Sequence, residues 1–410
     1  MKKLLLVLLI LSLFINHLNA NEKDLNIIQK DKKEYRLLDK ESIQTRQQSQ
    51  KYDWISPIDL SGNIGRNHSF SDENSRNLNN KNTKSASIGF TQSIFESGGI
   101  GFKMDYADNR FKYEMLSWEN QNSQLIYTIY NTLLDIKKLK LEINQNDYRI
   151  VNKDIELIIK KIQYEAGKTD IIELNNAIMS KNLILKEEIA LKNSLKEKEQ
   201  ELAKYTDLKY DEIEILDFQE TNKDIFLDKN YSILEADAKV EMLNSEYKIK
   251  KSQYLPKLSL SAKASYSSQD EKFNSMISDT NKDDATSSGS LILSMPLYDY
   301  TKSSKIQESK IEVLKQKALV NDLKNETAFE YEQIFTKIDT YLKQNETINK
   351  NIKLYEELIG ANQISSEAGM TSKYDLEILE NTKTINEFDI LINKINILQQ
   401  YAKLYFKIKN

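Results

Sequence analysis

Two long stretches of the chain carry apolar residues at the spacing of a coiled coil. In the first stretch apolar residues recur every seven positions; they are Ile129, Ile136, Ile143, Ile150, Leu157 and Tyr164. In the second they follow steps of four and three; they are Ile334, Ile338, Tyr341, Ile348, Ile352, Tyr355 and Ile359. Such sustained heptads predict long helices that pack side by side. Asn345 fills the one skipped position of the second series. A polar side chain there either fixes the register or lies exposed.

After each of these predicted helices the chain reverses direction near a glycine. Gly167 and Gly369 both follow a Glu-Ala pair, and apolar residues at helical spacing continue beyond the first of them. Glycine suits the end of a helix because it adopts positive φ angles without strain. We therefore predict two helical hairpins, one over residues 100–203 with its tip near 167 and one over residues 301–409 with its tip near 369.

Four shorter segments alternate apolar and polar residues, which is the period of a β-strand. They lie at about 57–66, 85–95, 256–267 and 289–298, and a polar segment separates the two members of each pair. A period of two places the apolar residues on one face of a sheet and the polar residues on the other. The chain therefore predicts two amphipathic strand pairs. Three prolines stand at the expected strand boundaries; they are Pro57, Pro256 and Pro296.

This order of elements occurs twice. Three motifs recur 199, 203 and 202 residues later; the matched pairs are Pro57 and Pro256, Ile94 and Leu297, and Glu165 and Glu367. A repeated order at a nearly constant offset indicates an internal duplication. We predict a first repeat over residues 21–203, an inter-repeat linker over 204–229 and a second repeat over 230–410. A helix is expected before the first strand of each repeat, at 25–51 and at 230–254.

The N-terminus has the features of a secretory signal. Lys2 and Lys3 precede an apolar run over residues 4–15, and the small residue Ala20 follows at a suitable cleavage position. The run is too short to span a bilayer as an anchor, and no comparable apolar stretch follows it. We expect residues 1–20 to be removed and the mature chain to leave the cytosol without a transmembrane helix.

Composition argues against several kinds of site. The chain has no Cys and two His, one of which lies in the predicted signal, so disulfides and thiolate or histidine metal sites are not expected. Its net charge of -4 comes from interspersed charges of both signs, which does not indicate nucleic-acid binding. No catalytic triad or phosphate-binding loop appears in the sequence. We expect no cofactor, no metal and no enzymatic activity.

The amphipathic strand pairs suggest a membrane. Only helices and closed barrels satisfy their backbone groups in lipid. Four strands cannot close a barrel around a pore, because barrels of this kind begin at about eight strands. If the apolar face meets lipid, several chains must share one barrel, and three chains would supply twelve strands. A homotrimer therefore follows from the membrane interpretation.

The duplicated motifs resemble the TolC family of outer-membrane factors over about residues 25–409. Four motifs carry the resemblance: Tyr164-Glu165-Ala166-Gly167 with Glu173, Leu174 and Ala177; Glu367-Ala368-Gly369 with Asp375 and Leu376; Leu255-Pro256; and Met295-Pro296-Leu297-Tyr298-Asp299. The resemblance implies a mainly α protein with membrane β structure. Long coiled-coil hairpins would form a periplasmic α-barrel, and four strands per chain would enter a shared twelve-strand trimeric β-barrel.

The resemblance also implies a location, a function and partners. The protein would be the outer-membrane channel of a tripartite efflux pump or type I secretion system, with a large periplasmic extension. It would receive substrates from an inner-membrane transporter of the ABC, RND or MFS type through a periplasmic adaptor protein. The expected partners are thus two further copies of the chain, the adaptor, the transporter and outer-membrane lipid, and no nucleic acid.

The resemblance assigns the gate to the hairpin tips. Glu173 and Asp375 each stand six residues after a tip glycine and would line the periplasmic constriction, where three copies of each would form rings that favour cations. The tip turns would contact the adaptor; they comprise Gly167, Lys168, Thr169, Gly369, Met370 and Thr371. The alternative is that both acids are solvated residues at helix starts, where a negative charge suits the helix dipole.

Several gate residues of the family are absent. Some relatives have Tyr three residues before the second tip glycine, Arg two residues after it and a second acid nine residues after it. This chain has Ser366, Thr371 and Ile378 at those positions. A resting lock must therefore be weaker or use other contacts, for which Lys168 and Lys373 are candidates.

Three other classes of protein fit part of the pattern. A periplasmic adaptor has a signal and one hairpin flanked by Gly-rich β domains, whereas this chain has two hairpins and 10 Gly. A trimeric coiled-coil adhesin or filament requires neither a return through a glycine turn nor amphipathic strand pairs. An exported enzyme would require a catalytic constellation that the sequence lacks.

Overall fold

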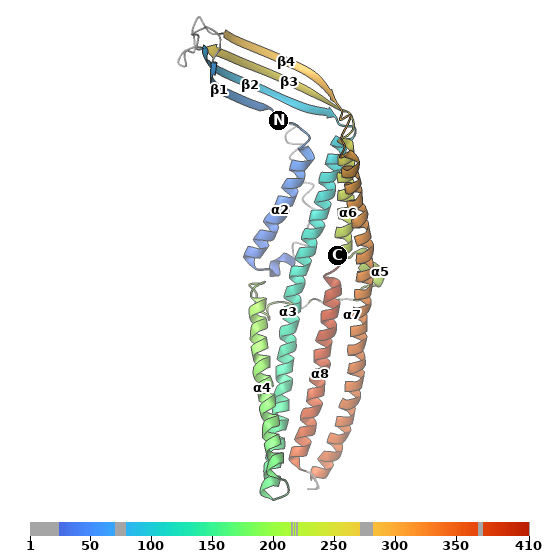
Figure 1. The fold of residues 1–410 in the computed structure, drawn as a ribbon. Coiled ribbons are helices and arrows are strands. Elements are labelled where there is room, and N and C mark those ends of the chain that lie inside the picture. The colour runs from blue at the N-terminus through green and yellow to red at the C-terminus, as the bar shows by residue number, and fades with distance from the viewer. Residues whose placement is uncertain are drawn as a thin grey trace, which may run out of the picture. The chain divides into compact units, whose positions relative to one another are not determined.

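The computed structural model describes residues 24–69, 79–214, 216, 218, 220–270, 282–367 and 372–409. The predicted signal, residues 1–20, lies outside the described residues. In chain order the elements are η2 (Asp24–Ile27), α2 (Lys30–Tyr52), β1 (Asp59–Ser69), β2 (Asn79–Phe95), α3 (Gly99–Glu165), α4 (Ile171–Leu202), α5 (Lys223–Asp228), α6 (Tyr231–Ser252), β3 (Lys257–Asp270), β4 (Lys282–Ser294), α7 (Lys302–Glu367) and α8 (Lys373–Tyr405) (Figure 1).

The fold is mainly helical with four antiparallel strands, as the sequence predicts. The elements α2-β1-β2-α3-α4 are followed, after the short α5, by α6-β3-β4-α7-α8 in the same order. None of the described helices combines the length and the apolar character that crossing a membrane would require.

The chain divides into two compact units. The helical unit comprises residues 1–40, 116–234 and 321–410, and the sheet unit comprises residues 41–115 and 235–320. Helices α2, α3, α6 and α7 each contribute residues to both units.

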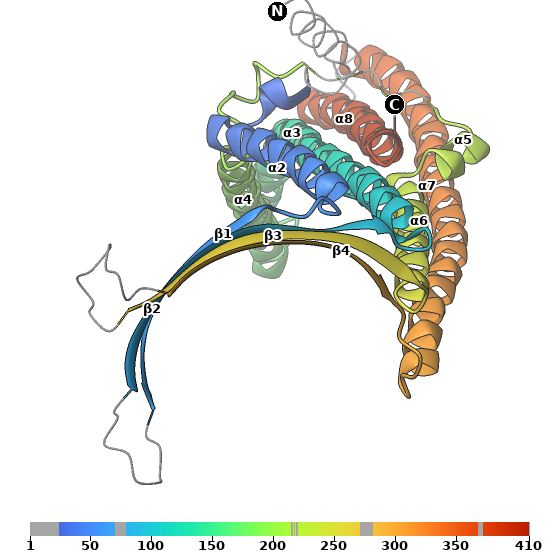
Figure 2. The same ribbon diagram turned by 90° about the horizontal axis from the view of Figure 1, so that it is seen from above.

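The sheet unit contains one four-stranded antiparallel sheet in the order β1-β2-β3-β4. The strands of each repeat form a hairpin, and β2 pairs with β3 to join the two hairpins; Ile88 lies opposite Leu60 of β1 and Ala264 of β3. The strands lie in one curved layer (Figure 2). Because β2 begins at Asn79 and β4 at Lys282, the strands extend into the polar segments. Backbone hydrogen bonds do not require apolar side chains, so the alternation underestimates the strand length there.

The three prolines stand just outside the strands. Pro57 precedes β1 by two residues, Pro256 directly precedes β3, and Pro296 follows the end of β4 by two residues. Proline lacks the N–H that a sheet ladder needs, which confines it to such boundaries. Ser97, whose φ is 51°, donates from its Oγ to the carbonyl of Pro256 at 2.7 Å. This hydrogen bond ties the end of the first strand pair to the start of the second.

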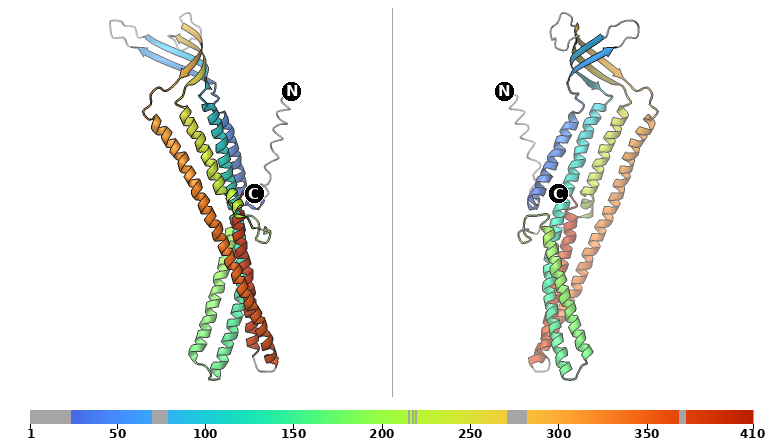
Figure 3. Two further views of the ribbon diagram at one scale, coloured as in Figure 1. Left: turned by 90° about the vertical axis from the view of Figure 1, so that its right-hand side faces the viewer. Right: turned by 60° about the vertical axis from the view of Figure 1, so that its left-hand side comes forward.

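Two helical hairpins, α3–α4 and α7–α8, dominate the helical unit, and their tips lie at the same end of it (Figures 1 and 3). Ile129 and Ile136 of α3 and Ile334 and Ile338 of α7 are buried, whereas Tyr164, close to the first tip, is exposed. Further apolar side chains on the hairpins stay exposed in the single chain; they include Ile172, Met179, Leu183, Ile189, Leu342 and Leu354. One chain therefore buries only part of the apolar surface of its hairpins.

The two legs of the second hairpin meet at a pair of asparagines. Asn393 of α8 donates from Nδ2 to Oδ1 of Asn345 of α7 at 2.9 Å. The hydrogen bond joins the polar position of the heptad series to the opposite leg, and a pair of this kind is satisfied at only one register.

The segment between the repeats packs onto the hairpin helices within the helical unit. Phe226 of α5 is fully buried in a cluster with Ile334 of α7 and Leu404 of α8. Upstream, the ring of Phe218 lies 5.6 Å from that of Phe406 and 5.9 Å from that of Tyr130. Aromatic pairs at such distances add to the apolar burial. Two buried aromatic residues, Phe218 and Phe226, therefore anchor this segment along its length.

Helix α2 is attached to α3 through a buried arginine. Arg36 donates to Oδ1 of Asn122 at 2.6 Å, to Oε1 of Gln121 at 2.9 Å and to the carbonyl oxygen of Trp118 at 3.0 Å. Trp118 donates in return from its indole nitrogen to the carbonyl oxygen of Arg36 at 2.8 Å. These reciprocal hydrogen bonds satisfy a charge that would otherwise be costly to bury.

Candidate functional site

The two faces of the sheet differ in chemistry. On one face, named here the apolar face, the strand register brings together large exposed side chains; they are Leu60, Ile64, Ile88, Leu260, Leu291 and Leu293. Leu60 is 80% exposed and Leu293 is 73% exposed in the single chain. Such an extended apolar surface marks a contact with lipid or with another apolar surface.

The opposite side, named here the hydroxyl face, is covered by serine and threonine. Neighbouring strands are joined there by hydrogen bonds between hydroxyl groups; the pairs are Ser61 and Ser87 at 2.8 Å, Thr91 and Ser261 at 3.1 Å, and Ser265 and Thr286 at 2.8 Å. These pairs span all three strand junctions of the sheet. The sheet therefore offers a hydrophilic wall on one side and an apolar wall on the other.

Both outer edges of the sheet lack a partner strand in the described chain. β1 pairs only with β2, and β4 pairs only with β3. An edge strand presents a row of backbone N–H and C=O groups that can pair with another chain. In lipid each unpaired group would be costly, so a sheet with this apolar face needs further strands at both edges.

The tip of the first hairpin is a glycine turn followed by a capped helix. Gly167 has a φ of 65°, in the left-handed region that glycine adopts most easily. Asp170 caps the N-terminus of α4, and its carboxylate accepts a hydrogen bond from the backbone N–H of Glu173 at 2.9 Å. Between them lie Lys168, which is exposed, and Thr169, which is half-buried. The tip conformation is thus fixed by local chemistry.

Glu173 is exposed but electrostatically paired. The Nζ of Lys160, on the opposite leg of the hairpin, lies 3.0 Å from Oε2 of Glu173. An ion pair this exposed adds little stability, yet it places a positive charge beside the predicted gate acid. Sequence inspection misses Lys160 because it lies 13 residues upstream and belongs to no motif.

The second tip differs in its electrostatics. Ser372 caps the N-terminus of α8, and its hydroxyl accepts a hydrogen bond from the backbone N–H of Tyr374 at 3.1 Å. Asp375 is exposed in the first turn of α8, and among the described residues no basic side chain forms an ion pair with it. The remaining residues assigned to this tip lie outside the described residues; they are Gly369, Met370 and Thr371.

Neither predicted lock residue is engaged within the described chain. Lys168 and Lys373 are both exposed, and neither forms an ion pair or side-chain hydrogen bond with any residue that the structure places. The contacts between the hairpins lie instead along α3 and α8. Gln145 donates to Oδ1 of Asp389 at 2.7 Å, and Asn381 donates to Oδ1 of Asn152 at 2.9 Å.

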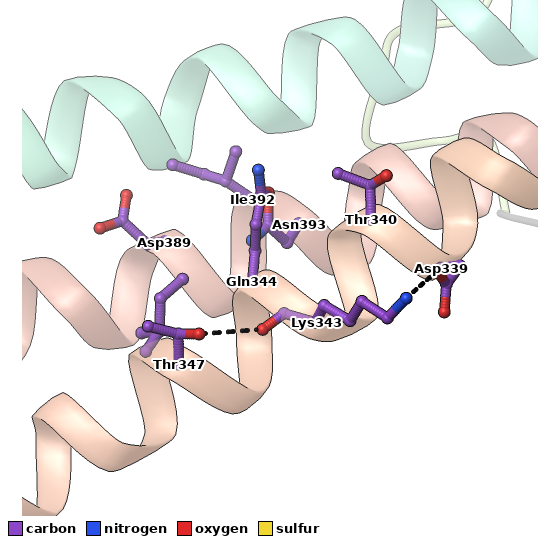
Figure 4. Close-up of a pocket in the computed structure, with 9 residues that line it drawn as sticks. Asp339, Thr340, Lys343, Gln344, Thr347, Asp389, Ile392 and Asn393 are labelled. Carbon is purple, nitrogen blue, oxygen red and sulfur yellow. Dashed lines mark hydrogen bonds and ion pairs between the residues drawn. The ribbon is translucent and has the colours of Figure 1, made fainter.

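A groove of about 570 Å³ runs between α7 and α8 (Figure 4). It is lined by Asp339, Thr340, Lys343, Gln344, Thr347, Ile348, Asp389, Ile392 and Asn393. Its charged groups have partners within the chain: Lys343 pairs with Asp339 at 2.6 Å, and Asp389 accepts the hydrogen bond from Gln145. Nowhere in the described part of the chain do three or more His, Cys, Asp or Glu residues gather so that they could hold a metal ion.

Comparison with known proteins agrees with this geometry. Residues 224–403 match the family described as outer membrane efflux protein. No curated protein matches the chain. Among solved structures, the outer membrane protein VceC of Vibrio cholerae superposes with a TM-score of 0.71 at 12% identity, covering 91% of this chain and 93% of VceC. The CmeC outer membrane channel of Campylobacter jejuni gives a TM-score of 0.70 at 12% identity, covering 92% of this chain and 84% of CmeC.

A channel captured in an open state has the same fold. The MtrE outer membrane channel of Neisseria gonorrhoeae gives a TM-score of 0.67 at 11% identity, covering 91% of this chain and 85% of MtrE. The chain thus has the fold of an outer-membrane channel over nearly its whole length.

The predicted resemblance to the TolC family of outer-membrane factors is confirmed by the family match together with this fold. Residues 224–403 thus match the outer membrane efflux protein family, and nearly the whole chain has the fold of known outer-membrane channels.

Proposed function

We propose that three copies of the chain form a channel through which substrates from an inner-membrane transporter cross the outer membrane. In this assembly the three sheets join edge to edge into a twelve-strand barrel, with β4 of one copy beside β1 of the next. The single observation that carries the proposal is the sheet itself: one apolar face, one hydroxyl face and two unpartnered edges.

The faces of the sheet fit the two environments of such a barrel. The apolar face meets lipid, and the hydroxyl face lines the water-filled lumen. Closing the barrel supplies partners for the edge groups of β1 and β4, which removes the cost of exposing them to lipid. A four-stranded sheet in one chain meets this requirement only by association.

The exposed apolar residues of the helical hairpins support the same assembly. Ile172, Met179 and Leu183 of α4 and Leu342 and Leu354 of α7 are exposed in one chain. Neighbouring copies would cover them when the hairpins pack into a ring of helices around the periplasmic tunnel. Burial of apolar surface is the main driving force for such association.

The hairpin tips would form the gate and the docking surface for a periplasmic adaptor. Three copies of Asp375, and three of Glu173, would line the constriction and favour cations. Gly167, Lys168 and Thr169 would contact the adaptor, together with residues 369–371 of the second tip. The transporter behind the adaptor, of the ABC, RND or MFS type, would make the complex either a tripartite efflux pump or a type I secretion system.

Assembly and location test the proposal. Outer membranes are isolated, and the mature protein is run in mild detergent with and without heating. The expected result is an outer-membrane trimer that dissociates on heating and conducts ions in planar bilayers. A protein that remains a periplasmic monomer would refute the proposal.

A second experiment identifies the cargo. The gene is deleted and restored, and drug susceptibility is compared with the profile of secreted proteins. A loss of drug resistance that the restored gene reverses assigns the channel to efflux, whereas the loss of one secreted protein assigns it to type I secretion. If neither changes in any condition that expresses the gene, the export role is wrong.

A further inference from the structure

One row across the hydroxyl face carries two charges of opposite sign. The strand register places Asp59 of β1, Gly89 of β2, Lys263 of β3 and Ser288 of β4 in one row across the sheet. The rows on either side carry hydroxyl groups, with Ser61, Ser87 and Ser265 in one and Thr91, Ser261 and Ser290 in the other. We name the row of Asp59, Gly89 and Lys263 the charged row.

The two charges of the row are close but not paired. Their Cα atoms are separated by two strand spacings, or about 10 Å. Gly89 stands between them, and a Cβ added there would lie 3.3 Å from Cγ of Lys263. The aliphatic stem of Lys263 therefore lies beside the glycine, where any larger residue would displace it. Within the described residues neither Asp59 nor Lys263 takes part in an ion pair.

A hollow of about 440 Å³ opens on the sheet around this row. It is lined by Asp59, Ser61, Ser87, Thr91, Ser261 and Lys263, among others. Asp59 and Lys263 are both exposed, so both charges are available to solutes on this side of the sheet. The hydroxyl groups of Ser61 and Ser87 already bond to each other, as do those of Thr91 and Ser261. The two charges are thus the strongest groups in the hollow for attracting an ion.

We propose that Asp59 and Lys263 determine the ion preference of the barrel wall and that each charge masks the other. The proposal rests on the proposed function, because it requires the hydroxyl face to line a lumen. In the native channel the charged row has equal numbers of positive and negative groups. The row therefore discriminates little between cations, anions and dipolar solutes, and selection by charge is left to charges elsewhere in the channel, including the hairpin tips.

Removing one charge exposes the other. In the Lys263→Gln channel three Asp59 carboxylates remain, and the permeability ratio of K⁺ to Cl⁻ is expected to rise about threefold. In the Asp59→Asn channel three Lys263 ammonium groups remain, and the ratio is expected to fall about threefold. The size of these changes is that of three charges acting on an ion through about 10 Å of salt solution. The double variant should return to the native ratio, because the two changes cancel.

Matched controls stand on the other face of the same sheet. Lys84 and Asp283 have the opposite strand parity from Lys263 and Asp59, so Lys84→Gln and Asp283→Asn remove the same charges from the apolar side. These controls are expected to leave the ratio at the native value. Equal shifts in the controls and in the charged-row variants would show a general effect of net charge and overturn the proposal.

The experiment measures reversal potentials of purified trimers in planar bilayers under a KCl gradient. If wild-type trimers form no channel, the proposed function is wrong; if they conduct but both single variants keep the native ratio, only the charged-row inference is wrong. A variant that fails to assemble is replaced by Lys263→Cys, the sole cysteine in the chain, since the natural sequence has none. Modification of the assembled channel with an aminoethyl thiol reagent should restore the native ratio, and an unchanged ratio after modification would refute the role of Lys263.

Discussion

The two predicted gate acids are expected to contribute unequally to ion selection. Glu173 is paired with Lys160 at 3.0 Å, whereas Asp375 has no ion-pair partner among the described residues. A passing ion within a screening length of the first site meets both signs of charge and feels little net field. The Asp375→Asn channel should therefore lose most of the cation preference of the tip, whereas a channel that lacks both members of the Lys160–Glu173 pair should lose little.

The size of the effect follows from Coulomb's law. A carboxylate about 5 Å from the ion contributes about 0.8 kcal/mol in water, and salt reduces this by about half. Three Asp375 carboxylates then favour K⁺ by about 1.3 kcal/mol and disfavour Cl⁻ by about the same amount, which together correspond to about an 80-fold change in the permeability ratio of K⁺ to Cl⁻. The double variant Lys160→Gln/Glu173→Gln should change the ratio by less than about twofold, because it removes a neutral pair.

A third variant makes the prediction specific to the ion pair. Lys160→Gln removes the masking cation and leaves Glu173, so cation preference should increase. The assay is the reversal potential of single channels under a KCl gradient, with Lys196→Gln as a control because Lys196 is an exposed lysine elsewhere in α4. If the double variant Lys160→Gln/Glu173→Gln changes the ratio as strongly as Asp375→Asn, or if Lys160→Gln lowers cation preference, the reasoning is wrong.

Three further predictions concern stability and the tip. Arg36→Ala should loosen α2 on α3, at a cost of about 3 kcal/mol, because the buried Oδ1 of Asn122 loses its charged donor. Faster proteolysis of residues 30–52 would show it, and cleavage at the wild-type rate would contradict it. Burial alone raises the pKa of Glu330, but hydrogen bonds from Lys403 and Lys407 outweigh it and hold the pKa below its ordinary value. The carboxylate therefore stabilises the fold above about pH 4.3, and this contribution is lost as the pH falls through the lowered pKa. In denaturation series from pH 7 to pH 3, the difference in unfolding free energy between wild type and Glu330→Gln should shrink. A difference independent of pH would refute the linkage. Gly167→Ala should destabilise the first tip by about 1 kcal/mol, because the backbone at residue 167 has a positive φ. Hydrogen exchange at residues 165–170 would detect the change. The control Ala166→Gly should lack this strain.

Much of the architecture can be predicted from the sequence because it depends on short periods. The heptad spacing of Ile129 and Ile136 predicted the buried face of α3, and both are fully buried. The alternation around Leu60 predicted a sheet with one apolar and one polar face. A strand or helix period repeats within a few residues, so neighbouring positions in the sequence carry the signal without knowledge of the fold.

The strand ends show where this signal fades. In the segments after Arg66 and before Ser85 almost all residues are polar, and the alternation no longer distinguishes a strand from a loop. The structure extends β1 to Ser69 and starts β2 at Asn79, because backbone pairing continues where side chains give no preference. The packing of Phe218 and Phe226 between the repeats likewise could not be predicted from the sequence, since neither residue belongs to a periodic pattern.

The sequence by itself determined the duplication, the element types, the amphipathic strands and the positions of the tip acids. Only the tertiary structure decided which groups meet: Lys160 with Glu173, Arg36 with Trp118, and Asp59 with Lys263 in one row of the sheet. The physical reason is the range of the interactions. The pattern of buried positions can be recognised from neighbouring residues in the sequence. Whether a charge is neutralised depends on side chains that only the folded chain brings within a few ångströms.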